Sequence, residues 1–394
     1  FQNLCLRELK EEDRYMELFL DKRNMFFCGL ILYVFRSFFS YTSYPVPIPI
    51  LTFLWYGAIF CWVLAIIMRF EWNPLIIIEL CAVAYGFFSY KITGSTNILA
   101  IILILLSSKE IECRDIIDVL FKVTAPLMGF SIVWYGINFI LGNAVVTKTR
   151  EINGTVSMRH SFYFNHANGF SLYFLFICLM FFYLYYKNIN KKILYLVLLC
   201  GGAFIYIFPN TRTVAIVLVL VILFDILINL QSSFAVRFIC KNLFIIGLAM
   251  VLVLAVAYLN NPDLGILKKI DDFMNGRLTM IAGAYDLYGI NLSGHKIINE
   301  EIFLPKLGYF TLYIDNFWGM LLIRYGLISS ALVGIIAIYT SYSLDKHGEK
   351  LDLILMAAIF LFGLSESTAL DIFPVFPWLF FKETGVYKYL EERP

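Results

Sequence analysis

Three arginines, Arg159, Arg212 and Arg277, stand in loops or at helix ends that hydropathy places on one face of the chain. Lys and Arg normally gather on the cytoplasmic side of a membrane protein, so guanidinium groups on the other side need a reason. A ligand that carries phosphate is one, because a guanidinium fork matches two phosphate oxygens at once. The alternative is that these basic residues only decorate solvated loops.

A carboxylate accompanies the arginines. Asp315 stands where a predicted span begins, with Asn316 beside it and Arg324 further along the same segment, and Glu366 lies at the outer end of the next span. Arginines would neutralise a charged leaving group, while a carboxylate could take a proton from an attacking hydroxyl. The alternative for Asp315 is that it caps the helix, as Asp often does. The two roles are compatible.

The segment before the sixth predicted span carries a third group of polar residues. Arg159 and His160 are followed by His166 and Asn168, and Arg150 lies upstream. Asn168, at a helix start, can cap that helix or help its backbone N–H groups to bind an anion. His166 is either a proton carrier or an ordinary loop histidine.

The elements that must position these residues are transmembrane helices. Of the 394 residues, 60% are hydrophobic and 15% are charged, whereas a soluble domain carries about 25% charged residues. Apolar windows of about 20 residues predict an all-α polytopic membrane protein, a single transmembrane domain over residues 1–394 with about twelve transmembrane helices. They cover residues 24–40, 50–68, 74–92, 95–108, 123–142, 167–186, 193–210, 212–230, 242–259, 316–343, 352–369 and 370–386.

The distribution of basic residues sets the orientation of these spans. With the N-terminus inside, the inner segments hold nineteen Lys and Arg residues and the outer segments hold ten, spread over far more loop sequence. This asymmetry predicts a multi-pass protein with both termini cytoplasmic. Glu79, inside the third span, is an intramembrane carboxylate and therefore a functional suspect. The eight cysteines show neither metal-ligand spacing nor a disulfide framework.

Two outer loops are long, at residues 143–166 and 260–314. The second is too long for a passive connection and should carry its own structure. Within it, Leu278, Ile281, Ala282 and Tyr285 follow Gly276 at helical spacing, which predicts an amphipathic helix at the membrane surface or over a cavity.

Four short motifs in this order resemble those of a known family, the bacterial polysaccharide polymerases of the Wzy type and the related O-antigen ligases. The motifs are Asn165-His-Ala-Asn-Gly169, Thr211-Arg-Thr213, Asn275-Gly-Arg277, and Asp315-Asn316 followed nine residues later by Gly326. They fall on spans six to ten, whereas the first five spans contribute only hydropathy.

The motifs also depart from the family's pattern. Ala167 replaces the Pro of the first motif, Asp315 stands where the ligases keep a catalytic His, and Ser329 replaces the last Gly. The Asp argues for a capsular or exopolysaccharide polymerase over a ligase and leaves the base undetermined. If Asp315 is not the base, His166, His295 and Glu366 are the next candidates, in that order.

The resemblance implies a GT-C-like architecture and a glycosyltransferase of the bacterial plasma (inner) membrane. Its activity would be the polymerisation of undecaprenyl-pyrophosphate-linked repeat units into capsular, exo- or O-antigen polysaccharide at the outer face. The catalytic residues would be Asp315, Arg212 and Arg277, with the two guanidinium groups within about one pyrophosphate length of each other. The residues expected to bind substrate are Arg159, His160, His166, Asn168, Arg150, Asn316, Arg324, His295 and Glu366.

The expected partners follow from the same resemblance. They are undecaprenyl-pyrophosphate-linked glycans as donor and acceptor, the surrounding membrane lipid, a flippase and a chain-length regulator, with no nucleic acid. No cofactor and no metal is expected, because the sequence holds no acidic cluster suited to Mg²⁺. Two other readings stay open. One is ligase-type transfer to another acceptor; the other is a lipid-linked sugar flippase or transporter, which should show pseudo-symmetric halves.

Overall fold

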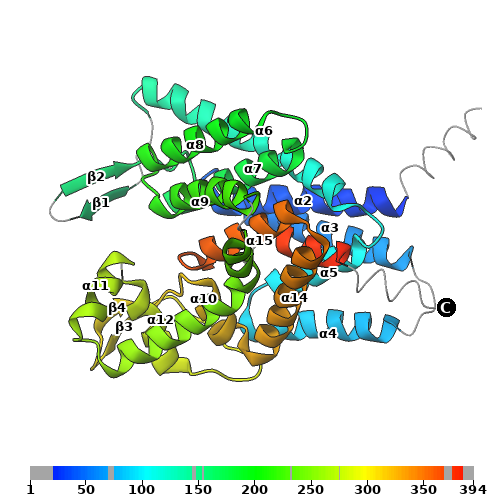
Figure 1. Cartoon of the computed structure of the whole chain (residues 1–394). Helices are drawn as coiled ribbons and strands as arrows, with labels where there is room; N and C mark the ends of the chain where they lie inside the picture. The colour runs from blue at the N-terminus through cyan, green and yellow to red at the C-terminus, as the bar shows by residue number, and fades with distance from the viewer. Residues whose placement is uncertain are drawn as a thin grey trace, which may run out of the picture. The chain divides into compact units, whose positions relative to one another are not determined.

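The computed structural model describes residues 21–69, 75–143, 148–152, 155–230, 233–274, 276–367 and 375–384. The chain is mostly helical (Figure 1). Its internal contacts divide it into two compact units. Unit 1 comprises residues 1–84 and 100–173, and unit 2 comprises residues 85–99 and 174–394.

Among the described residues, each predicted apolar segment contains helix, although several bounds differ from the predicted ones. Long apolar runs satisfy their backbone polar groups best as helices. Seven helices in the described part are long and apolar enough to cross a membrane. This supports an integral membrane protein, and the number of twelve spans stays a prediction. The long helices are α2 (Lys22–Tyr41), α3 (Ile48–Ile67), α4 (Leu75–Thr93), α6 (Cys113–Ile140), α7 (Ala167–Tyr185), α10 (Phe234–Asn260) and α14 (Gly326–His347). The shorter ones are α5 (Asn97–Ser107), α8 (Lys191–Ile207), α9 (Arg212–Ile228), α15 (Lys350–Gly363) and α16 (Val375–Glu383).

The segment 316–343, predicted as one continuous helix, is broken. It begins with the single turn α13 (Phe317–Gly319) and the π-helix η1 (Met320–Arg324), and α14 follows. Gly326 at the break has φ +79°, and Gly294 of the large loop packs directly against it with φ +84°. A Cβ on either glycine would overlap the backbone of the facing segment, so only glycine permits this close contact.

The large loop carries a helix where the sequence predicts one. It is α12 (Arg277–Tyr288), which buries Leu278, Ile281 and Ala282. The short helix α11 (Gly265–Phe273) precedes it, and the antiparallel strands β3 (Glu301–Leu304) and β4 (Gly308–Thr311) follow. A second hairpin, β1 (Lys148–Ile152) with β2 (Thr155–Arg159), lies in the segment 143–166, which the sequence predicts as a loop. The all-α prediction missed both hairpins, because strands of four or five residues give too short an alternating pattern to detect.

Unit 1 is built on close packing of α2 against α3. The Cα of Gly29 faces the Trp62 ring and the carbonyl of Ala58, where a Cβ would not fit. Small residues of this kind let membrane helices approach closely. In the same unit, Glu79 forms an ion pair with Lys109. This pairing gives Glu79 a structural explanation that the sequence did not supply.

Unit 2 is organised around α10, which packs against α12, α14 and α15 (Figure 1). Helix α9 packs against α8 and α15. Lys350 Nζ, at the start of α15, lies 3.4 Å from Asn229 Oδ1, just past the end of α9. The two helices therefore run antiparallel, and the start of α9 lies at the same end of the pair as the end of α15.

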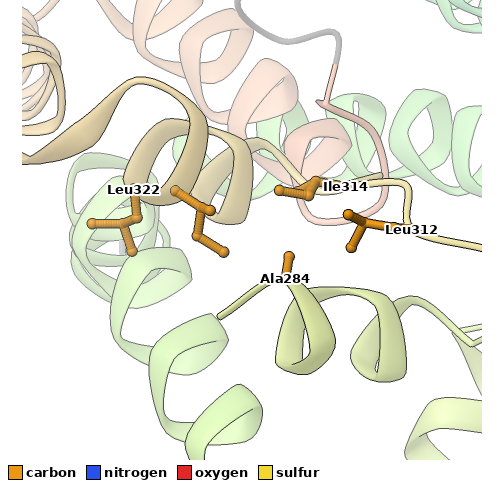
Figure 2. Packing of buried hydrophobic residues seen from close by; sticks show 5 residues of the cluster. Ala284, Leu312, Ile314 and Leu322 are labelled. Carbon is orange, nitrogen blue, oxygen red and sulfur yellow. The ribbon is translucent and has the colours of Figure 1, made fainter. Parts of the chain in front are cut away.

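A cluster of buried side chains joins α12 to the segment that carries Asp315 (Figure 2). Ala284 of α12 meets Leu312 and Ile314, from the strand-like stretch after β4, and Leu322 from η1. These side chains are at most 6% exposed. Because close-packed cores resist small displacements, the cluster holds α12 and η1 in fixed relative positions.

Asp225 is a fully buried carboxylate near the C-terminal end of α9. It accepts hydrogen bonds from the hydroxyls of Tyr186 and Tyr195, each at 2.5 Å. Lys191 Nζ lies 3.2 Å away, and Asn229 Nδ2 donates at 3.1 Å. All four partners belong to unit 2, so Asp225 fastens α9 to α8 and to the end of α7.

We expect Asp225→Ala to destabilise the protein by about 3 kcal/mol, because it leaves four donors without their buried acceptor. The check is the midpoint of thermal unfolding in detergent. Asp118→Ala is the matched control, because its pair with Lys122 is largely exposed and such pairs contribute little. Equal midpoints for the two variants would contradict this account of Asp225.

Candidate active site

Arg277 is the first residue of α12. A side chain of the preceding helix, α11, holds the start of α12 in place. Gly276 precedes it at φ +78°, and its turn supplies no capping side chain. The carboxylate of Asp271 in α11 caps the helix instead, accepting from the N–H groups of Leu278 at 2.8 Å and Thr279 at 3.1 Å. A ligand phosphate therefore cannot use these N–H groups and must bind to side chains. Asn275, the first residue of this motif, lies outside the described residues.

The side chain of Arg277 lies between two carboxylates. Its Nη2 is 3.3 Å from Asp315 Oδ2 and 3.0 Å from Glu366 Oε1. These residues are 38 and 89 positions away in the chain. The Arg277 and Glu366 side chains are 13% and 9% exposed, whereas that of Asp315 is 21% exposed. Asp315 is thus the carboxylate more open to a substrate, and Glu366 is the more enclosed partner.

The Nη2 atom of Arg277 forms an ion pair with both carboxylates, whereas its Nε atom does not take part in these pairs. Its Nε is buried and has no hydrogen-bond partner in the described part of the chain. A buried N–H without an acceptor costs about 1–3 kcal/mol, and an added oxygen would remove that cost. Asp315 and Glu366 therefore hold the Arg277 guanidinium in place, while its Nε–H can still donate to an anion.

The charge at this site does not favour an anion by itself. One guanidinium faces two carboxylates, so a bound diphosphate needs a further cation. Arg212, the exposed first residue of α9, lies at the same end of the α9–α15 pair as Glu366, because that pair is antiparallel and Glu366 closely follows α15. The start of α9 adds its positive dipole end. The expected meeting of Arg212 and Arg277 across one pyrophosphate stays a prediction.

Asn316 positions Asp315 from within the protein. It is fully buried; its Oδ1 caps α13 by accepting from Gly319 N at 3.0 Å, and its Nδ2 donates to Leu364 O at 2.7 Å. The helix cap is thus Asn316, and the alternative in which Asp315 is that cap is wrong. Asn316 ties the backbone beside Asp315 to the backbone that precedes Glu366, so we assign it a positioning role.

Trp318 anchors the same segment on α10. Its ring is fully buried against Gly247, where a Cβ would overlap it, and its Nε1 donates to Phe244 O at 3.0 Å. The site therefore depends on three supports: the Asp271 cap, the Asn316 amide and this ring.

Arg324 and His295, also expected to bind substrate, lie together in unit 2 but in a different group. The backbone N–H of His295 donates to Arg324 O at 2.9 Å. Arg324 Nη2 donates to Thr93 O at 3.4 Å, and its Nε is buried without a partner among the described residues, as is His295 Nε2. The His295 ring packs against Tyr288 at the end of α12.

The remaining predicted site residues belong to unit 1. Arg159 Nη2 donates to Asn168 Oδ1 at 2.6 Å, which fixes both side chains at the start of α7. His166 is exposed at the same helix start. Arg150 lies on β1, where its Cα partner is Ser157. These residues therefore form a separate group within unit 1.

His160 lies in an aromatic cage. Its Nδ1 is 2.7 Å from the Tyr135 hydroxyl, and its ring packs against Tyr135, Phe139 and Phe162. Burial lowers the pKa of His160 below its usual value, because a desolvated imidazole disfavours its charged form. Phe162 and its neighbour Tyr163 have φ of 51° and 65°, a conformation that bulky residues rarely adopt. The geometry therefore indicates a neutral, structural histidine in a strained loop.

Three residues with a structural or possible binding role were not predicted from the sequence: Asp271, Asp225 and Lys296. Asp271 falls in an ordinary charged stretch of the sequence. Only its hydrogen bonds with the first N–H groups of α12 show that it is a helix cap. Asp225 interrupts an apolar span and could have been flagged on that ground. Lys296 is adjacent to His295 in sequence, and that adjacency was the available signal.

No family model, no curated protein and no solved structure matches this chain.

Proposed function

We propose that this protein is a polysaccharide polymerase of the bacterial plasma membrane, with its active site at the outer face and both termini in the cytoplasm. Its substrates would be two undecaprenyl-pyrophosphate-linked glycans. The growing chain on one carrier is the donor, and a single repeat unit on a second carrier is the acceptor. The proposal combines the four ordered motifs with the site around Arg277.

The reaction forms one bond and breaks one. A hydroxyl oxygen at the non-reducing end of the acceptor attacks the anomeric carbon of the donor. The bond from that carbon to the phosphate oxygen breaks, and its electron pair leaves with the lipid pyrophosphate. The hydroxyl proton passes to Asp315. Pyrophosphate is a good leaving group, so the protein contributes orientation and charge stabilisation.

The proposal depends mainly on one observation: one nitrogen of the Arg277 guanidinium pairs with two carboxylates, and another nitrogen has no partner among the described residues. Its Nη2 is bonded to Asp315 and Glu366, while its Nε is buried and unpartnered in the described part of the chain. One side chain can thus bond a phosphate oxygen and hold a carboxylate beside the same substrate. The leaving group and the proton acceptor of a glycosyl transfer need this proximity.

Arg212 supplies the remaining charge in this proposal. With it, the donor diphosphate would meet two guanidinium groups and the start of α9, enough to offset the two carboxylates. Asp315, as the more exposed carboxylate, faces the acceptor hydroxyl, and Glu366 keeps the fork oriented.

The test is the carbohydrate that accumulates in cells that lack this protein. We expect single repeat units attached to lipid pyrophosphate at the outer leaflet, with polymer restored by the wild-type chain. Full-length polymer that remains on lipid would instead indicate a ligase. Repeat units confined to the inner leaflet would indicate a flippase. Either result would overturn the proposed polymerase.

A further inference from the structure

The cations around Arg324 form a second group, remote from Arg277. Arg324 Nη2 donates to Thr93 O, and the Cε of Lys296 lies 3.8 Å from where a Cβ on Gly94 would be. Both side chains therefore flank the same turn, which follows α4. His295, whose Nε2 is unpartnered, is hydrogen-bonded through its backbone to Arg324.

Nothing in the described part of the chain neutralises these charges. Neither Arg324 nor Lys296 forms an ion pair there, whereas other basic residues, such as Lys109, Arg237 and Arg277, do. Capping the end of α4 explains one N–H of Arg324, namely the one that donates to Thr93 O. It does not explain the buried Nε without an acceptor, nor a second cation at the same turn. Two cations without an ion pair, one half-buried (Arg324) and one exposed (Lys296), favour an anion with several oxygens.

The group is held rigidly at a defined distance from Arg277. The loop that carries His295 is hydrogen-bonded to the start of α14, with Leu327 N to Asn291 O at 2.9 Å and Ile328 N to Leu292 O at 3.1 Å. The His295 ring packs on Tyr288, the last residue of α12, while Arg277 is its first. The 12 residues of α12 separate the two groups by about 18 Å at 1.5 Å per residue. The buried cluster of Figure 2 joins α12 to η1, which ends at Arg324.

We infer that Arg324, Lys296 and His295 bind the pyrophosphate of the acceptor carrier, an inference that depends on the proposed polymerase. In that reaction the donor pyrophosphate lies at the bond that breaks. The acceptor attacks with its far end, so its own pyrophosphate must lie one repeat unit away. A polymerase therefore needs two diphosphate sites separated by a short oligosaccharide, and α12 provides such a spacing.

The test measures how many isoprenyl pyrophosphates the purified protein binds in nanodiscs of zwitterionic lipid. With geranylgeranyl pyrophosphate as the probe, wild type should bind two equivalents. Lys296→Gln should weaken one of the two sites about tenfold, and Lys296→Gln with Arg324→Gln should abolish that site and leave the other unchanged. Lys296 is exposed, so its substitution spares the fold. Lys306→Gln, an exposed lysine of the same loop, is the matched control and should bind as wild type does.

Further arms identify the source of the anion. Inorganic pyrophosphate should compete at both sites, whereas nanodiscs that contain phosphatidylglycerol should not reduce the binding. Displacement by phosphatidylglycerol would make this an ordinary headgroup site and overturn the inference. One equivalent in wild type, unaffected by Lys296→Gln, would also overturn it, while the proposed polymerase would stand if repeat units accumulate without the protein. If wild type binds two equivalents of geranylgeranyl pyrophosphate but cells that lack the protein still make normal polymer, both the acceptor assignment and the proposed polymerase are overturned.

Discussion

Arg277→Lys is expected to reduce polymer synthesis about a hundredfold or more, the usual effect of removing one donor from a preorganised anionic site. A lysine ammonium is a point charge on a flexible stem and cannot span two carboxylates while it bonds a phosphate oxygen. The measurement is the yield of polymer per molecule of membrane-inserted protein, from repeat units supplied to purified wild type and variant.

The control for this prediction is Arg23→Lys. Arg23 also bonds a carboxylate, Asp115, but both side chains are exposed, so the exchange should leave polymer yield unchanged. Normal yield from Arg277→Lys would mean that the fork is not needed. If Arg277→Lys lowers the thermal midpoint as much as Asp225→Ala does, the Arg277 ion pairs serve the fold, and the catalytic assignment is wrong.

Asp315→Asn is expected to abolish polymer while the protein remains folded. An Asn keeps the shape and can still accept from Arg277, so the variant loses the negative charge and the ability to take a proton but keeps the hydrogen bond. Loss of a general base typically costs about 10²–10⁴ in rate. The measurements are the initial rate of chain extension and the thermal midpoint, which should stay near that of wild type.

Glu366→Gln is the comparison that separates the two carboxylates. Because Glu366 is more enclosed and bonds the same Nη2, we expect a smaller loss of rate than for Asp315→Asn. The reverse order would make Glu366 the base. If Asp315→Asn keeps normal polymer, Glu366 becomes the first replacement, ahead of His166 and His295, because it bonds the same guanidinium.

The sequence by itself determined the helices and the order of the motifs. In lipid, an apolar run longer than 17 residues satisfies its backbone hydrogen bonds within a helix, so α2, α3 and α10 could be placed from hydropathy alone. Helix α12 followed from local periodicity, since Leu278, Ile281 and Ala282 recur on one face. The outer-face position of Arg277 and Asp315 remained a prediction of the charge distribution.

Only the tertiary structure decided which polar residues meet. Arg277 bonds Asp315 and Glu366 across 38 and 89 residues, and no local pattern encodes such a separation. The same holds for the Gly294–Gly326 contact that breaks the predicted helix. Periodicity records which face of one element is buried, whereas partner choice depends on how several elements pack together. The sequence therefore indicated which residues could do chemistry. Packing brought Arg277 to its carboxylates and left Arg324 without an ion pair among the residues that the structure describes.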